Sequence, residues 1–139
     1  MTLVTRLAGP LCLLLLGCST ECALDDDMHL FAGDGATDCG TADASHDRVE
    51  VDQCATDAFE AGKAFMARYA ETGQSSKLVT AVAGNTAGKV KVFRWTDSPS
   101  AVTDVQSCEE PSLNLETSQD PEALPINCTS LGLPQRICS

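Results

Sequence analysis

Cysteine is the residue type whose number and spacing carry the most chemistry in this chain. The sequence of 139 residues holds eight cysteines and two histidines. None of the six cysteines beyond residue 18 shows the C-x-x-C spacing of a zinc site, and neither His29 nor His46 lies at ligand spacing from them. An even number of cysteines in an exported chain predicts a disulfide framework instead. The six are Cys22, Cys39, Cys54, Cys108, Cys128 and Cys138.

The remaining two cysteines, Cys12 and Cys18, belong to an apolar N-terminal stretch. Arg6 precedes an apolar run over residues 7–16, which only Gly9-Pro10 interrupts. A positive charge followed by an apolar run of this length predicts a secretory signal. The run is shorter than the roughly 20 apolar residues that a membrane-spanning helix needs. It ends in the sequence Leu-Leu-Gly-Cys at Cys18.

This ending resembles the lipobox of bacterial lipoproteins, a family of envelope proteins with many unrelated roles. The resemblance implies cleavage before Cys18, a diacylglycerol on its sulfur and an acyl chain such as palmitate on its amine. Two or more acyl chains anchor a protein stably to a membrane. By the same resemblance, Ser19 after the lipidated cysteine implies the outer membrane. The alternative is an ordinary signal peptide that is cut after Ala23.

On this interpretation the chain has three parts. Residues 1–17 are a lipoprotein signal peptide, 18–38 an acidic flexible tether and 39–139 a single small domain. The tether is predicted from clustered acidic residues and low hydrophobicity. The net charge of −11 becomes −12 once Arg6 is removed. Such an acidic chain is not expected to bind the phosphates of nucleic acids, so lipid rather than charge must hold it at a membrane.

A helix is predicted over residues 48–61. Asp47 and Glu50, three residues apart, form a capping-box pattern. From Val51 onward, apolar residues recur at the i, i+3, i+4, i+7 and i+8 positions of one helical stripe. Gly62 then suits the position after the helix end.

Three strand-like runs follow, over residues 63–71, 77–83 and 89–96, with Gly- and Asn-bearing turns between them. Short strands are also expected at 113–115 and 126–128. The sequence therefore predicts an α+β domain with one helix packed on an antiparallel meander of three to five strands, ending in an irregular, disulfide-stapled tail. This element order is similar to that of the cystatin-like fold, although no cystatin inhibitory motif is present.

Position along the chain favours Cys39–Cys54 as the first disulfide. Cys54 lies on the apolar stripe of the predicted helix. Cys39 lies in the segment that must double back along the helix to enter it at Asp47. The bond would close a short loop, which the chain-entropy model values at about 3 kcal/mol.

The other four cysteines leave a choice. Cys108–Cys128 would join two candidate strands, and Cys22 would then pair with Cys138. The alternative is Cys128–Cys138, with Cys22 bonded to Cys108 or free.

One face of the third strand is a candidate binding face. Alternation places Lys89, Lys91, Phe93 and Trp95 on the same side. Aromatic and basic side chains together suit a sugar ring of an envelope polysaccharide or an anionic partner. Alternatively, the face is core: the segment after Pro99 covers Trp95, and the basic residues of the meander pair with acids of the helix and tail.

These patterns favour a non-catalytic binding or structural module of the cell envelope, attached to the membrane through its lipid. Its partner would be an envelope protein or polysaccharide. The alternatives are a hydrolase inhibitor presenting the loops 72–73 and 84–88, and a small cell-wall hydrolase. The hydrolase is disfavoured because no G-x-S-x-G, H-E-x-x-H or S-x-x-K motif occurs. No cofactor or metal is predicted, and the oligomeric state is left open.

Overall fold

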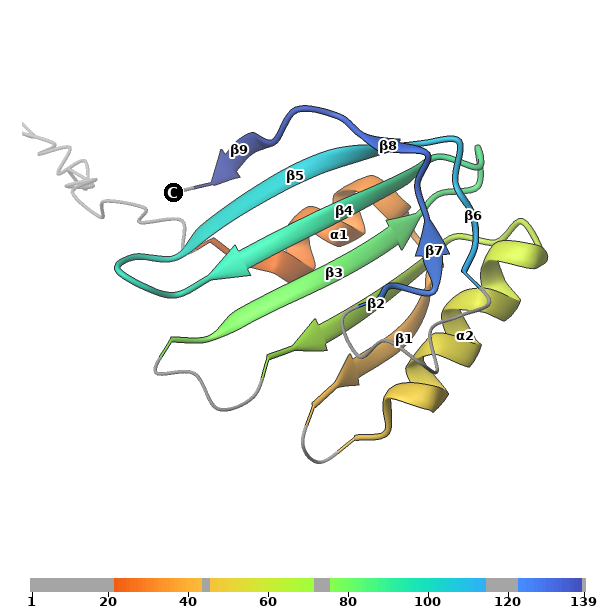
Figure 1. Cartoon of the computed structure of the whole chain (residues 1–139), viewed down its shortest axis with the longest axis horizontal. Helices are drawn as coiled ribbons and strands as arrows, with labels where there is room; N and C mark the ends of the chain where they lie inside the picture. Colours follow the sequence, from red (N-terminus) through yellow and green to blue (C-terminus); the bar gives the residue numbers. More distant parts are fainter. Residues whose placement is uncertain (1–21, 44–45, 72–75, 115–122, 139) are drawn as a thin grey trace, which may run out of the picture.

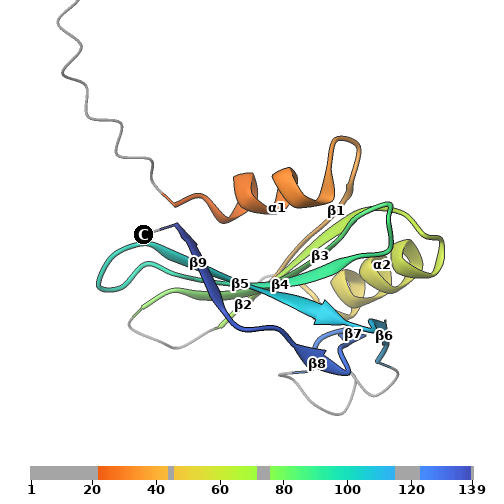
Figure 2. The ribbon, with the colours of Figure 1, turned by 90° about the horizontal axis from the view of Figure 1, so that it is seen from above.

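Two helices lie on opposite faces of one β-sheet in the computed structural model (Figures 1 and 2). The structure describes residues 22–43, 46–71, 76–114 and 123–138. In chain order the elements are α1 Leu24–Ala32, β1 Thr37–Ala42, α2 Arg48–Glu60, β2 Phe65–Ala70, β3 Leu78–Gly84, β4 Val90–Thr96, β5 Val102–Glu109, β6 Ser112–Leu113, β7 Ile126–Asn127, β8 Ser130–Leu131 and β9 Gln135–Cys138.

The main sheet has seven strands, in the order β1-β2-β3-β4-β5-β8, and β9 pairs beside β8 along β5. β2 to β5 form the predicted antiparallel meander. The α+β class is confirmed, and the three predicted strands match β2, β3 and β4 closely. β1 was not expected, and it runs parallel to β2. The short strands β6 and β7 pair with each other, close to where they were predicted.

The strand β2 shows why polar and apolar residues do not alternate clearly along the meander. Five of its six residues are buried. Phe65, Ala67 and Tyr69 pack in the cluster beneath α2, whereas Met66 packs in a second cluster beneath α1. Because a helix covers each face, apolar residues are favoured at consecutive positions rather than at alternate ones.

The helix α2 begins and ends within one residue of the prediction. The Asp47 carboxylate accepts a hydrogen bond from the Val49 backbone N–H at 2.9 Å, as an N-cap residue does. Val51, Ala55 and Ala58 are its buried residues. Small residues on the buried stripe allow the helix to lie close over β1 and β2.

The prediction of a flexible tether over 18–38 is wrong for the described residues 22–38. They form α1 and enter β1, and Leu24, Met28 and Ala32 are buried against the sheet. Three aspartates occupy the first turn of α1. Negative side chains there interact favourably with the helix dipole, so an acidic cluster that suggested disorder in fact starts a helix.

One glycine of the sheet permits close packing of an aromatic ring. Gly84 lies opposite Phe65 across β2 and β3. A Cβ atom at Gly84 would lie 2.4 Å from a ring carbon of Phe65. The same ring meets Phe59 of α2 edge-on, with 6.5 Å between the ring centroids. Glycine at this position therefore lets Phe65 fill the space between sheet and helix.

Three disulfides fasten the fold. They join Cys39 to Cys54, Cys108 to Cys128 and Cys22 to Cys138, with Cα–Cα distances of 5.5, 5.2 and 5.5 Å. The favoured pairing is therefore confirmed, and the alternative Cys128–Cys138 bond is wrong. Among the described residues, no helix has the length and apolar character needed to cross a bilayer.

Removing the disulfide between β1 and α2 should destabilise the domain measurably. We expect the double variant Cys39→Ala/Cys54→Ala to lose about 3 kcal/mol of unfolding free energy, because the bond closes a loop of 15 residues. Urea unfolding followed by circular dichroism measures this loss. The double variant Cys108→Ala/Cys128→Ala is the matched comparison, since its sequence separation of 20 predicts a similar loss. An unchanged midpoint would contradict the assignment.

Candidate functional site

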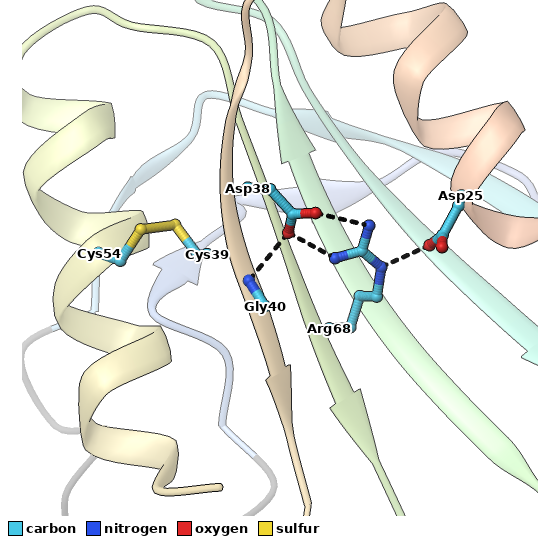
Figure 3. Close-up of polar contacts among 6 residues, drawn as sticks. All are labelled: Asp25, Asp38, Cys39, Gly40, Cys54 and Arg68. Atoms are coloured by element: carbon cyan, nitrogen blue, oxygen red, sulfur yellow. Dashed lines mark hydrogen bonds and ion pairs between the residues drawn. A yellow bond between two sulfur atoms is a disulfide. The ribbon is translucent and has the colours of Figure 1, made fainter.

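The centre of the candidate site is Arg68, a buried cation between α1 and the sheet. It is 8% exposed. Its Nε donates to Asp25 Oδ1 at 2.6 Å, and its Nη1 donates to Asp38 Oδ1 at 2.7 Å (Figure 3). Its Nη2 makes a longer contact of 3.5 Å with Asp38 Oδ2. The guanidinium therefore uses its fork of donors to hold two carboxylates at once.

Three elements bring these side chains together. Arg68 lies on the α1-facing side of β2, Asp25 lies in the first turn of α1, and Asp38 lies on β1. The β1–β2 register shifts between Asp38 and Thr41. Within this irregularity, Gly40 has a φ of 81° and its N–H donates to Asp38 Oδ1 at 2.9 Å. The bulge thus fixes the Asp38 carboxylate where it meets Arg68.

Hydrogen bonds between Arg68 and its carboxylate partners shift the pKa values of Asp38 and Arg68 toward their charged forms. The hydrogen bond from Arg68 holds the pKa of Asp38 below its ordinary value, burial opposes this effect, and the Gly40 N–H adds to it. Burial acts to lower the pKa of Arg68, but hydrogen bonds to Asp38 and Asp25 outweigh it and raise the pKa overall. Both shifts favour the charged forms of Asp38 and Arg68. Two carboxylates and one guanidinium give the cluster a formal net charge of −1.

A pocket of about 270 Å³ opens beside this cluster, between the start of α1 and the sheet. Trp95 forms part of its wall, and the indole Nε1–H donates to the Cys22 carbonyl at 3.0 Å. The lining residues are Cys22, Ala23, Leu24, Asp25, Thr41, Arg68, Val79 and Trp95.

The lining of this pocket is mainly apolar, with charge at one side. Its polar groups are a guanidinium, a carboxylate and a hydroxyl, and the sulfur of Cys22 is held in a disulfide. Since both aspartates already engage Arg68, the guanidinium is poorly placed to hold an anion. Such a set of groups suits reversible binding of a small apolar or cationic group.

The predicted binding face does not form one open surface. Phe93 is 1% exposed beneath α1, whereas Lys89 is exposed at the end of the strand. The Lys91 Nζ lies 4.8 Å from the centre of the Phe31 ring of α1, a cation–π contact. Trp95 is partly covered: its Nε1–H donates to the Cys22 carbonyl, and Thr103 of β5, which follows Pro99, pairs with it in the sheet. The helix α1 therefore covers this face.

Other sequence-predicted candidates lie apart from the pocket. His46 is exposed, and its Nε2 lies 3.7 Å from Glu50. His29 lies in the last turn of α1. No group of three or more His, Cys, Asp or Glu side chains within the described ranges is placed to hold a metal ion. Of the two inhibitor loops, 72–73 lies outside the described residues, and the 84–88 turn is closed by the Asn85 side chain.

Sequence reasoning missed both carboxylates of the cluster. One signal could have found the helix that carries Asp25: Leu24, Met28 and Ala32 are spaced four residues apart. The basic meander was expected to pair with acids of α2 and the tail, yet Arg68 pairs with the N-terminal segment instead. No local pattern identifies Asp38, because its meeting with Arg68 depends on the parallel β1–β2 pair.

No protein-family model matches this chain, no curated protein matches its sequence and no solved structure matches its fold.

Replacing the central cation should cost much stability. We expect Arg68→Met to lose about 1–3 kcal/mol of unfolding free energy, because Asp25 and Asp38 would lose the charged donor that they share and would be left close to each other. Arg136→Met is the matched control, since Arg136 makes a similar ion pair with Asp104 at 3.0 Å but on the exposed surface. That change should have little effect. Equal losses in the two variants would show that burial of the Arg68 guanidinium is unimportant.

The same cluster predicts an acid dependence of stability. Because the folded-state pKa of Asp38 is depressed, its contribution is present above the ordinary aspartate pKa of about 3.9 and is lost as the pH falls through the lower folded value. Burial raises the pKa of Asp27, an effect that the Thr103 hydroxyl opposes and Asp26 reinforces, so protonation of Asp27 acts in the opposite direction. We therefore expect the difference in stability between wild type and Arg68→Met to shrink below about pH 4. A constant difference between pH 7 and pH 2 would contradict this.

Trp95 offers a direct readout of the pocket. It is the single tryptophan of the chain. Its wild-type emission should be blue-shifted, since the ring is partly covered. In Cys22→Ser/Cys138→Ser we expect a red shift and stronger quenching by iodide, because the Cys22 carbonyl is no longer held against the indole. The double variant Cys39→Ala/Cys54→Ala, which leaves the pocket wall intact, should keep the wild-type spectrum.

Proposed function

We propose that this protein is a lipid-anchored, non-catalytic binding or structural module of the bacterial cell envelope, attached through acylated Cys18. The single observation that carries the proposal is the use of cysteines. All six cysteines after residue 18 form disulfides, which belong to an oxidising compartment. Cys18, which ends the lipobox-like Leu-Leu-Gly-Cys sequence, is left over from this framework and is the residue that the resemblance assigns to the lipid.

The Cys22–Cys138 bond gives the anchor a defined place on the domain. Cys22 is four residues from Cys18, and the bond ties the first described residue to the last. The start and the end of the domain therefore lie together, as Figure 1 shows for the C-terminus and the beginning of α1. Lipid on Cys18 would hold the domain by this end, and the outer membrane is the membrane that Ser19 suggests.

The binding role rests on the pocket beside Arg68 and Trp95. It lies at the anchored end, since Cys22 is one of its lining residues. Its apolar wall and net negative cluster suit a small apolar or cationic group of an envelope component. The acidity of the whole chain, with a net charge of −11, argues against nucleic acid as the partner.

Lipidation is tested by expressing the full chain in a bacterium and measuring the mass of the mature protein. We expect an N-terminal acylated cysteine at Cys18 and recovery in the outer-membrane fraction. Cys18→Ser should accumulate as unprocessed precursor. Cys12→Ser is the matched control, because Cys12 lies within the leader and its loss should leave processing unchanged. Normal maturation of Cys18→Ser, or a mature chain that begins after Ala23, would refute the proposal.

A further inference from the structure

The C-terminal segment carries a concentration of exposed apolar side chains. Leu131, Leu133 and Ile137 are 43%, 88% and 43% exposed. Isolated exposed apolar residues are ordinary on protein surfaces. These three, however, lie within seven residues of chain at one edge of the molecule.

That edge is the outer side of β5. β8 and β9 pair with β5 at either end of the strand, and the segment between them runs along the rim of the sheet (Figures 1 and 2). Arg136, the charged residue between Leu133 and Ile137, is already neutralised by Asp104. This rim therefore presents three exposed apolar side chains, and the charge of Arg136 is paired with Asp104.

The β9 end of this rim lies within reach of the proposed anchor, whereas Leu131 lies at the other end of β5. Four residues separate Cys18 from Cys22, and a chain spans at most about 3.5 Å per residue, so Cys22 lies within about 14 Å of a lipid attached at Cys18. The Cys22–Cys138 bond brings Cys138 to the same place, with a Cα–Cα distance of 5.5 Å. Ile137 is the next residue.

We propose that Leu131, Leu133 and Ile137 seat the domain on the bilayer surface to which Cys18 is anchored. This inference rests on the proposed lipidation and adds the orientation of the domain. A membrane is favoured as the occupant because the short connection from Cys18 to Cys22, and the bond from Cys22 to Cys138, keep the β9 end of this rim close to it. Electrostatic attraction is unavailable to so acidic a chain, so apolar side chains that enter the interface supply the contact.

The experiment uses the acylated full chain in phosphatidylcholine vesicles that contain brominated acyl chains, in a Trp95→Phe background. Leu133→Trp places an indole on the rim. Leu30→Trp, on α1, is the matched control because Leu30 is 87% exposed, against 88% for Leu133. We expect the emission of the Leu133→Trp variant to fall about twofold or more, since an interfacial side chain lies about 5–10 Å into the head-group boundary. The emission of the Leu30→Trp variant should be nearly unchanged.

A second measurement needs no substitution. Hydrogen exchange of the full acylated chain should be slower over residues 131–138 in vesicles than in a detergent that replaces the bilayer, with no difference over residues 24–32. If mass spectrometry shows acylated Cys18 but both indoles are quenched equally or not at all, the seating is overturned and the proposed function stands. An unacylated Cys18 overturns the proposed function, and this inference with it.

Discussion

The pairing of one buried guanidinium with two carboxylates organises the N-terminal half of the domain. Arg68 is the charged residue of β2, and its two partners come from α1 and β1, which precede it by 43 and 30 residues. A cation in that position would strongly disfavour folding if it were unpaired. The cluster therefore couples the docking of α1 to the pairing of β1, so the pocket wall and the sheet edge depend on the same interaction.

The three disulfides add stability that this modest apolar core does not supply. Each disulfide fastens a piece with little buried surface of its own: the glycine-containing strand β1 to α2, the short β7 region to β5, and the start of the chain to its end. A chain with few aromatic residues buries less apolar area per residue, and cross-links offset this by restricting the unfolded state. The polar contact between Arg48 and the Ala123 carbonyl further ties the tail to α2.

The parts of the structure that could be predicted are those in which local sequence and tertiary environment agree. The N-cap at Asp47 and the stripe from Val51 predicted α2, and Gly- and Asn-bearing turns predicted the meander. The helix α1 was missed because its three aspartates suggested disorder, although the same acids favour a helix start. β1 was missed because its glycine and aspartate weaken a strand signal, and because its stabilising contacts, the parallel pairing with β2 and the disulfide to α2, are tertiary. Lys91, Phe93 and Trp95 were correctly placed on one side of a strand, whereas Lys89 lies just before it. Alternation does not reveal that a helix covers that side.

The bond between Cys22 and Cys138 turns the described domain into a covalent ring, closed across 116 residues of sequence. A single cut in the backbone anywhere between these two cysteines opens the ring but releases no fragment. If a protease cuts a loop between strands, the two parts of the chain therefore remain one molecule. For the same reason, new N- and C-termini could be introduced in such a loop while the Cys22–Cys138 bond keeps the two original ends of the domain joined.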